Sequence, residues 1–476
     1  MKHKVSLTIL LLFSIFQLFP CTIGIVRADL TERGRPIIWK SRDSSVSNTY
    51  PVYNVNGIYP YVGVITNNVY DRVWMGVNSK GFSILNSLSL DLQGNNSSGN
   101  GNFMAYALSN FENIEHFEDY LNQSNSTGRA TKGNFAVTDA NGNAIMYEIS
   151  NNSWEKFDVN NVDDYPEGYI IRTNFSFTGG SSNGIERYER AIYQMETLKE
   201  QGLINVSSLI DNLVRDFSFE ANQAYEIPYY GHTYGYESFI DIKTSICNQN
   251  TTNAVIIEGI NNYDEIPIFW SITGFPAVTP VMPYIPRFFM QNSLDLAGLS
   301  QEIKSLLMNI PNYSSLLNTI YFHQDDLKGI WDLFDSYEED IITDFYQLLE
   351  DDDESFNFNT FMISLSIETY YLMLGIKNSL NNTITDDDTV IAIQNPKLRI
   401  YPNPVKSVFN IDLNHDFEND LKVTIFNIKG QVIHEGIYNS KLDTSFKLDN
   451  NISSGVYLIK ISDGEVHFSA KFLKVK

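Results

Sequence analysis

Cys21 is the residue of this chain whose position and type best suit nucleophilic chemistry. It follows a basic start, Lys2-His3-Lys4, and an apolar run too short to span a membrane, which together are typical of a secretory signal over residues 1–20. Cleavage before Cys21 would leave one residue with both a thiol and a free α-amine. The amine has an ordinary pKa of about 8 and can take the thiol proton, so the residue can attack an amide carbonyl without a histidine.

Two other fates of Cys21 fit the same stretch of sequence. The cysteine could be lipidated, although residues 18–20 are bulky and cyclic where lipoprotein signals carry small residues. Cleavage could instead fall after Ala28, because Val26 and Ala28 fit the small-residue rule better than the residues before Cys21 do. Position alone slightly favours this last alternative, which would remove Cys21 from the mature protein.

Composition and charge exclude several other classes of function. The chain has 476 residues, of which 43% are hydrophobic and 19% charged, so two or three domains are expected. A net charge of −24 is opposite in sign to that of a phosphate-backbone binder, so we expect no nucleic-acid partner. The two cysteines, Cys21 and Cys247, lie in no zinc-binding spacing, and we expect neither a metal nor a cofactor. After the signal, no stretch reaches about eighteen consecutive apolar residues, so no transmembrane segment is predicted.

The spacing of apolar residues predicts a part rich in strands followed by a helical part. Residues 21–26 and 36–40 predict a hairpin. Further strands are predicted over 61–65, 73–77, 82–85, 135–138, 144–148, 244–247, 253–259 and 266–271. Helical spacing appears over 184–201 and 206–217, and residues 295–380 carry apolar helix faces between acidic ones.

The composition changes near Asn381. Residues 381–396 are polar and charged, which is typical of a linker. Short strands with turn signals between them are then predicted over 398–401, 408–413, 422–428, 432–438, 445–448, 455–461 and 467–475. The economical interpretation is a separate β-sandwich domain over residues 397–476.

Three blocks of this tail resemble the type A C-terminal sorting domain of the type IX secretion system. They are LRIYPNP at 398–404, IFNIKGQ at 425–431 and SSGVYLIKI at 453–461. The resemblance implies that the type IX secretion machinery is a partner. It also implies passage through the periplasm and across the outer membrane of a Gram-negative bacterium, to the cell surface or the medium, and no catalysis by the tail. The alternative is an accessory carbohydrate-binding module.

Five motifs resemble the N-terminal nucleophile hydrolases of the isopenicillin N acyltransferase-like and choloylglycine hydrolase-like group. In chain order they are CT at 21–22, GRPIIWKSRD at 34–43, GVNSKGF at 76–82 with Asn86, RTNF at 172–175 and RYER at 187–190. The resemblance covers residues 21 to about 290. It implies an α+β fold over residues 21–380, a four-layer αββα sandwich with its helical part at 295–380. It also implies a cysteine-type amidase or acyltransferase acting on a small acyl amide, which moves the start at Cys21 ahead of the alternatives.

The motif at 34–43 contributes two candidate site residues by this resemblance. Asp43 corresponds to the aspartate that orients the α-amine, whereas a lone aspartate would more simply be a surface carboxylate paired with Arg42. Lys40 stands where choloylglycine-type relatives carry arginine. A cation near the thiol is retained, but the bidentate binding that arginine offers is lost.

The later motifs contribute the remaining candidates. The resemblance makes Asn174 a donor to the tetrahedral oxyanion and Asn86 a second donor, although asparagine is also common in turns after strands. Either Arg187 or Arg190 could match the arginine near the nucleophile, and we choose Arg187. The other arginine is expected to pair with a neighbouring glutamate on the solvent face.

Two further residues have simpler explanations. Cys247, in the strand predicted over 244–247, is expected to be a buried free thiol. His232 lies among tyrosines on a loop that could line a substrate entrance, although a surface loop histidine is the commoner case.

Two rival functions remain open on the sequence alone. The first is a secreted hydrolase of linear amides, or an acyltransferase to an amine acceptor, and an exported enzyme has little access to acyl-CoA, which favours hydrolysis. The second is a catalytically inactive surface or binding protein on the same scaffold, which the 28 Tyr and 30 Phe would suit. A mature start at Cys21 supports the first, and a start at Asp29 excludes it.

Overall fold

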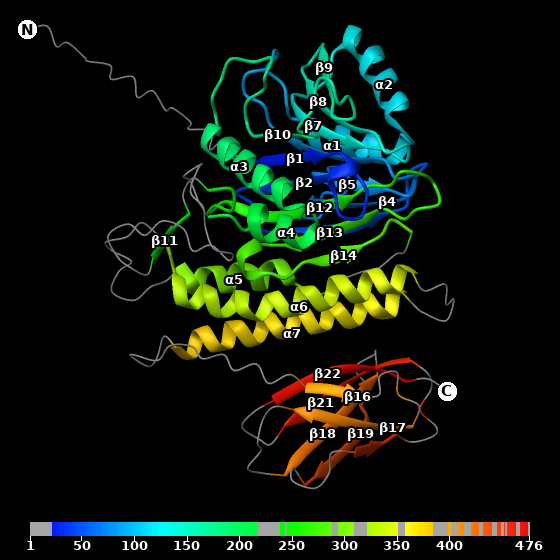
Figure 1. Cartoon of the computed structure of the whole chain (residues 1–476), viewed down its shortest axis with the longest axis vertical. Coiled ribbons are helices and arrows are strands. Elements are labelled where there is room, and N and C mark those ends of the chain that lie inside the picture. The colour runs from blue at the N-terminus through cyan, green and yellow to red at the C-terminus, as the bar shows by residue number, and fades with distance from the viewer. Residues whose placement is uncertain are drawn as a thin grey trace, which may run out of the picture.

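The computed structural model describes residues 21–217, 239–242, 245–287, 294–308, 321–350 and 358–383, together with the strands of residues 398–474 and a few residues beside them. Two antiparallel sheets lie face to face in the first part, and helices cover their outer faces (Figure 1). This arrangement is the four-layer αββα sandwich that the family resemblance implies. The signal segment at 1–20 lies outside the described residues.

The first sheet has six strands in the order β10-β1-β2-β12-β13-β14. Their bounds are β1 Thr22–Val26, β2 Ile37–Asp43, β10 Tyr169–Arg172, β12 Thr251–Glu258, β13 Ile268–Thr273 and β14 Met282–Tyr284. β1 and β2 form the predicted hairpin, with Ile23 opposite Lys40. β1 therefore lies between β2 and β10, inside the sheet, and its N-terminal end is held from both sides.

The second sheet has seven strands in chain order, β3 to β9. Their bounds are β3 Thr49–Asn54, β4 Tyr61–Thr66, β5 Met75–Asn78, β6 Ser83–Ser87, β7 Gly133–Thr138, β8 Ala144–Ile149 and β9 Trp154–Asp158. Successive residues of its strands enter different cores. Ile84 packs in the core beneath the first helices, and Leu85 packs in the core between the sheets. This period of two explains why both faces of the sheet are apolar.

Helices α1 (Asn100–Asn110) and α2 (Ile114–Thr127) cover the outer face of the second sheet. The sequence analysis does not predict them. Asparagine and serine, which are weak helix formers, occur in both segments. Packing of Phe103, Phe117 and Leu121 against the sheet stabilises them instead. Tertiary contacts here outweigh local propensity.

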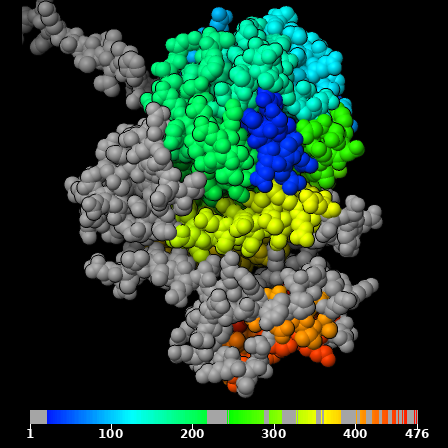
Figure 2. All heavy atoms as spheres, in the orientation of Figure 1, coloured from blue at the N-terminus to red at the C-terminus, as the bar shows by residue number. Residues whose placement is uncertain are grey.

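The outer face of the first sheet is covered by α3 (Ile185–Gln201), α4 (Val206–Leu209) with the π-helical turn η2 (Ile210–Val214), and α5 (Leu296–Met308). Helices α6 (Gln324–Glu350) and α7 (Phe358–Thr383) follow, so the predicted helical part is confirmed where the structure describes it. Buried Arg215 docks α6 through two 2.7 Å hydrogen bonds to Glu338. In the space-filling view the yellow atoms of these helices form a band beneath the sandwich (Figure 2).

Several predicted boundaries are wrong. Residues 245–247 form a bend rather than the predicted strand, because the chain turns there to bring Asn248 back toward the sheet. The helix predicted over 206–217 ends at Val214. Strands β3, β9, β10 and β14 and the short β11 (Phe239–Asp241) and β15 (Tyr321–His323) were not predicted. The linker cannot begin at 381, since α7 continues to Thr383, and residues 384–396 lie outside the described part.

The tail contains two small antiparallel sheets, of order β16-β17-β20 and β19-β18-β21-β22. The bounds are β16 Leu398–Tyr401, β17 Val408–Leu413, β18 Leu421–Asn427, β19 Val432–Tyr438, β20 Ser445–Lys447, β21 Gly455–Ser462 and β22 His467–Lys474. All seven predicted strands are confirmed within a residue. The tail has its own apolar cluster, which includes Phe409, Ile459 and Phe472 and no residue of the sandwich.

None of the helices in the described part of the chain is both long and apolar enough to cross a membrane.

Separate cores predict that the tail can be removed without unfolding the sandwich. Deletion of residues 397–476 should leave the urea midpoint unchanged when it is followed by tryptophan fluorescence, because all five tryptophans precede residue 381. The truncated protein should also accumulate in the periplasm, which cell fractionation would detect. A lowered midpoint, or normal arrival at the cell surface, would contradict this prediction.

Candidate active site

Cys21 lies immediately before β1, at the end of the sheet where β1 is flanked by β2 and β10. Only 9% of the residue is exposed. Side chains alternate along a strand, so Cys21 belongs with Ile23, and with Lys40 opposite it, on the face toward the second sheet. The thiol is therefore placed between the two sheets, at one end of the sandwich.

The backbone nitrogen of Cys21 is held by the first residues after β10. It donates to Asn174 Oδ1 at 3.1 Å. Arg187 Nη2 donates to the same oxygen at 3.0 Å, and Asn174 Nδ2 donates to the Leu88 carbonyl at 2.8 Å. A guanidinium group can only donate, so these contacts determine which end of the Asn174 amide faces the nitrogen of Cys21.

Arg187 is buried at the start of α3 and also binds the first residues of β1. Its Nη1 donates to the Cys21 carbonyl and to Thr22 Oγ1, both at 2.9 Å. Gly184, the N-cap of α3, has a φ of 82°, and a Cβ there would lie 2.4 Å from Arg187 Nη2. Glycine is therefore needed both for the left-handed backbone and for the space that the guanidinium fills.

Two cations approach the thiol from β2. Lys40 is fully buried, and its Nζ donates to Asn86 Oδ1 on β6 and to the Trp74 carbonyl, both at 3.0 Å. The pKa of Lys40 is lowered to about 8, because burial lowers it by more than the attraction to Cys21 raises it. Arg42 lies over the Trp74 ring, 4.9 Å from its centre. Burial lowers the pKa of Arg42 to about 10, and the attraction to Cys21 offsets part of this lowering.

Asp43 is buried on the other side of β2 from Arg42. Asn248 Nδ2 donates to its Oδ2 at 2.5 Å, and Thr251 Oγ1 donates to its Oδ1 at 2.7 Å. Burial raises the pKa of Asp43 to about 6, while Arg187 and the two hydrogen bonds lower it. Among the described residues no hydrogen bond joins Asp43 to the nitrogen of Cys21, and Asn174 makes that contact instead.

The turn that carries Asn174 is held by polar groups that the sequence analysis missed. Asn134 Nδ2 donates to the carbonyls of Thr173 and Phe175, at 3.2 and 3.1 Å, on either side of Asn174. Asp91 accepts hydrogen bonds from the backbone nitrogens of Ser176, Gly180 and Ser181. These partners are separated by 39 to 90 residues in the chain, so no local pattern could have identified them.

A fully buried ion pair supports the same turn. Arg172 Nε donates to Glu148 Oε1 at 2.9 Å, and the Arg172 guanidinium lies 3.6 Å from the centre of the Phe177 ring. Glu148 also accepts hydrogen bonds from the backbone nitrogens of Phe177 and Thr178. β8 thereby determines where the chain leaves β10.

Three expectations about single residues can now be assessed. The expectation that the second arginine would face solvent is wrong, because Arg190 is fully buried and donates to Asp216 at 2.6 Å. The alternative of a surface Asp43 is likewise excluded by its burial. Cys247 is buried, as expected, and burial raises the pKa of its thiol. His232 lies outside the described residues.

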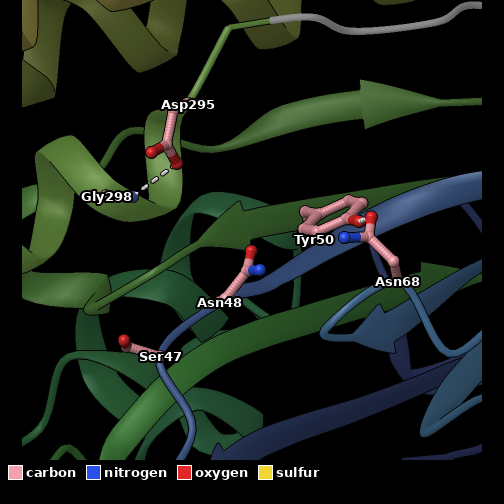
Figure 3. Close-up of a pocket in the computed structure, with 6 residues that line it drawn as sticks. All are labelled: Ser47, Asn48, Tyr50, Asn68, Asp295 and Gly298. Carbon is pink, nitrogen blue, oxygen red and sulfur yellow. Dashed lines mark hydrogen bonds between the residues drawn. The ribbon is translucent and has the colours of Figure 1, made fainter.

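A polar pocket of about 410 Å³ opens near the β2–β3 connection and the start of α5 (Figure 3). It is lined by Ser47, Asn48, Tyr50, Asn68, Asp295 and Gly298. Inside it the Tyr50 hydroxyl donates to Asn68 Oδ1. None of the six candidate site residues lines this pocket, so it is distinct from the space around the thiol.

No group of three or more histidine, cysteine or acidic side chains in the described ranges could hold a metal ion.

Comparison with known proteins identifies the tail. Residues 399–475 match the family model of the secretion system C-terminal sorting domain. The chain therefore ends in a sorting domain. Such a domain marks a protein for secretion or for attachment at the cell surface. No curated protein matches the sequence significantly.

Solved structures similar to the chain are partial matches. Penicillin V acylase from Agrobacterium tumefaciens is 15% identical with a TM-score of 0.32, over 56% of this chain and 86% of that one. A mutant of conjugated bile acid hydrolase from Clostridium perfringens is 14% identical with a TM-score of 0.34, over 56% of this chain and 92% of that one. A second variant of that hydrolase is 13% identical with a TM-score of 0.32, over 57% of this chain and 100% of that one.

The buried Glu148–Arg172 pair predicts a large loss of stability when one partner is removed. Glu148→Ala leaves Arg172 buried without its carboxylate, which should lower the free energy of unfolding by about 3–5 kcal/mol. Glu155, directly opposite on β9 and exposed, offers a matched control whose replacement by alanine should cost less than about 0.5 kcal/mol. Urea denaturation followed by tryptophan fluorescence measures both, and equal losses would contradict the prediction.

Proposed function

We propose that the chain is a secreted hydrolase of linear carbon–nitrogen amide bonds, with Cys21 as nucleophile and its own α-amine as general base. The proposal requires cleavage of the signal before Cys21. The observation that carries it is the hydrogen bond from the Cys21 nitrogen to Asn174, in a site where two buried cations also act on Cys21. If this nitrogen is a free α-amine, the buried polar cluster holds it in place to act as the base.

The groups suit acyl transfer through a thioester. The α-amine removes the thiol proton, and the sulfur attacks the amide carbonyl to form a carbon–sulfur bond and an oxyanion. The ammonium then gives its proton to the leaving amine as the carbon–nitrogen bond breaks. Water, deprotonated by the same amine, attacks the thioester and releases the acid and the thiol. Lys40 and Arg42 stabilise the thiolate by their charge.

Asn86 is the side chain that we assign to the oxyanion. Lys40 can only donate, so Asn86 Oδ1 must face it, and the Nδ2 group is left to donate elsewhere. Asn86 Nδ2 donates no hydrogen bond to any of the described residues. Asn174, by contrast, already uses Nδ2 on the Leu88 carbonyl and Oδ1 on Cys21 and Arg187. We therefore assign Asn174 to orientation of the amine.

The nucleophile assignment predicts that Cys21→Ala abolishes turnover of chromogenic acyl amides while the unfolding midpoint stays unchanged. Cys21→Ser should retain little activity, because a hydroxyl is harder to ionise than a thiol. Cys247→Ala is the matched control and should keep most of the activity. Equal turnover by the wild type and both Cys21 variants, or a mature N-terminus at Asp29, would exclude the proposal.

The buried lysine predicts a particular pH dependence. With a pKa of about 8, Lys40 loses its charge as the pH rises, so kcat/KM should fall above about pH 8. Lys40→Arg keeps the charge and should move this alkaline limb to higher pH, whereas Lys40→Met should lose activity at every pH. Lys80→Arg, at a half-exposed position, is the control. An alkaline limb at the same pH in wild type and Lys40→Arg would show that Lys40 does not set it.

A further inference from the structure

Lys304 of α5 is a buried cation outside the cluster described so far. Only 6% of the residue is exposed. Its Nζ donates to the Gln249 carbonyl at 2.5 Å and lies 4.4 Å from the centre of the Phe275 ring. Across the described residues it forms no ion pair within 4.0 Å. Burying an ammonium group without a close carboxylate is costly, so its position calls for a reason.

The carbonyl that Lys304 binds belongs to the turn that holds Asp43. Within this turn the Thr251 nitrogen donates to the Asn248 carbonyl, and the Asn248 nitrogen donates to Thr251 Oγ1, both at 2.9 Å. The side chains of the same two residues donate to the two oxygens of Asp43. Lys304 therefore braces the outer side of a turn whose inner side binds the carboxylate.

The charged groups that act on Asp43 come from three elements. Arg187 of α3 and Lys304 of α5 attract it, as do Lys40 and Arg42 of its own strand β2. Cys247, in the bend before the turn, is the other titratable group that interacts with it. Arg187 in turn binds Asn174 and the carbonyl of Cys21. A path of hydrogen bonds thus leads from α5 to Asp43, and the electrostatic attraction between Asp43 and Arg187 connects it to the hydrogen bonds that hold Cys21.

We propose that Lys304 is a positioning residue of the Cys21 site, which braces the Asn248–Thr251 turn and so keeps the Asp43 carboxylate in place opposite Arg187. The inference rests on the proposed function, because it concerns the same site. Through Lys304, helix α5 would also help to position the Cys21 amine at the start of β1.

The charge of Lys304 has a measurable consequence. It lowers the pKa of Asp43, which burial raises to about 6. Burial also lowers the pKa of Lys304, to about 8, so the lysine is still charged where Asp43 titrates. Removal of the charge should raise the pKa of Asp43 further. Asp43 would then be protonated at a higher pH. The step that Asp43 contributes to the acid limb of kcat/KM, below the step of the α-amine, should therefore move upward.

The test compares the acid limb in three variants of the full mature chain. Lys304→Gln keeps a donor for the Gln249 carbonyl but no charge, and should move the limb upward by about 0.5–1 pH unit. Lys304→Arg should restore the wild-type limb. Lys377→Met is the matched control, because Lys377 pairs with Glu302 on the more exposed side of α5. A limb at the wild-type pH in Lys304→Gln would overturn the proposal.

A second readout does not depend on activity. The carboxyl carbon of Asp43, labelled with carbon-13 and assigned by its loss in Asp43→Asn, reports the pKa of Asp43 directly by NMR. We expect this pKa to rise in Lys304→Gln and to stay unchanged in Lys377→Met. If the wild type hydrolyses no amide while the titration still shifts, the proposed function fails and the bracing role stands. An unshifted titration overturns the role of Lys304 even in an active enzyme.

Discussion

The Arg187 guanidinium is the group on which the rest of the site depends. It joins the start of α3 to Cys21, to Thr22 at the start of β1 and to the turn after β10, through hydrogen bonds of 2.9 to 3.0 Å. Cys21 and Thr22 lie more than 160 residues from Arg187 in the chain. A buried guanidinium is tolerated only when its donors are satisfied and a negative charge is near, and Asp43 provides that charge. The position of the Cys21 nitrogen follows from this one arrangement.

The local electrostatics of the site oppose those of the whole molecule. The chain carries a net charge of −24, yet Lys40, Arg42 and Arg187 surround Cys21 with positive charge. Burial between the sheets makes this field strong, because few water molecules screen it. Burial also brings the pKa of Lys40 down to about 8, so the field itself depends on pH. Desolvation therefore strengthens the positive field at Cys21 and also limits the pH range over which Lys40 contributes to it.

Export and chemistry are assigned to different parts of the chain. The sorting domain has a separate apolar cluster, and none of its described residues contributes to the site around Cys21. The sandwich, by contrast, is built so that both sheets and the helices α3 and α5 supply contacts to that site. Lys40 reaches across to β6, α3 contributes Arg187, and α5 reaches the turn beside Asp43 through Lys304. The tail thus serves export, whereas the proposed chemistry depends on both sheets of the sandwich and on the helices that cover the first of them.

The sequence by itself determined the features that depend on neighbouring residues. The β1–β2 hairpin, α3 behind Gly184 and the strands of the tail follow from local patterns of apolar, glycine and polar residues, and so does the prediction of a signal before Cys21. Only the tertiary structure decided that Arg187 rather than Arg190 lies in the site, and that Asn174 rather than Asp43 contacts the nitrogen of Cys21. It also decided that α1 and α2 are helical. These outcomes rest on contacts between residues far apart in the chain, and a hydrogen bond across 153 residues leaves no periodic signal in the sequence.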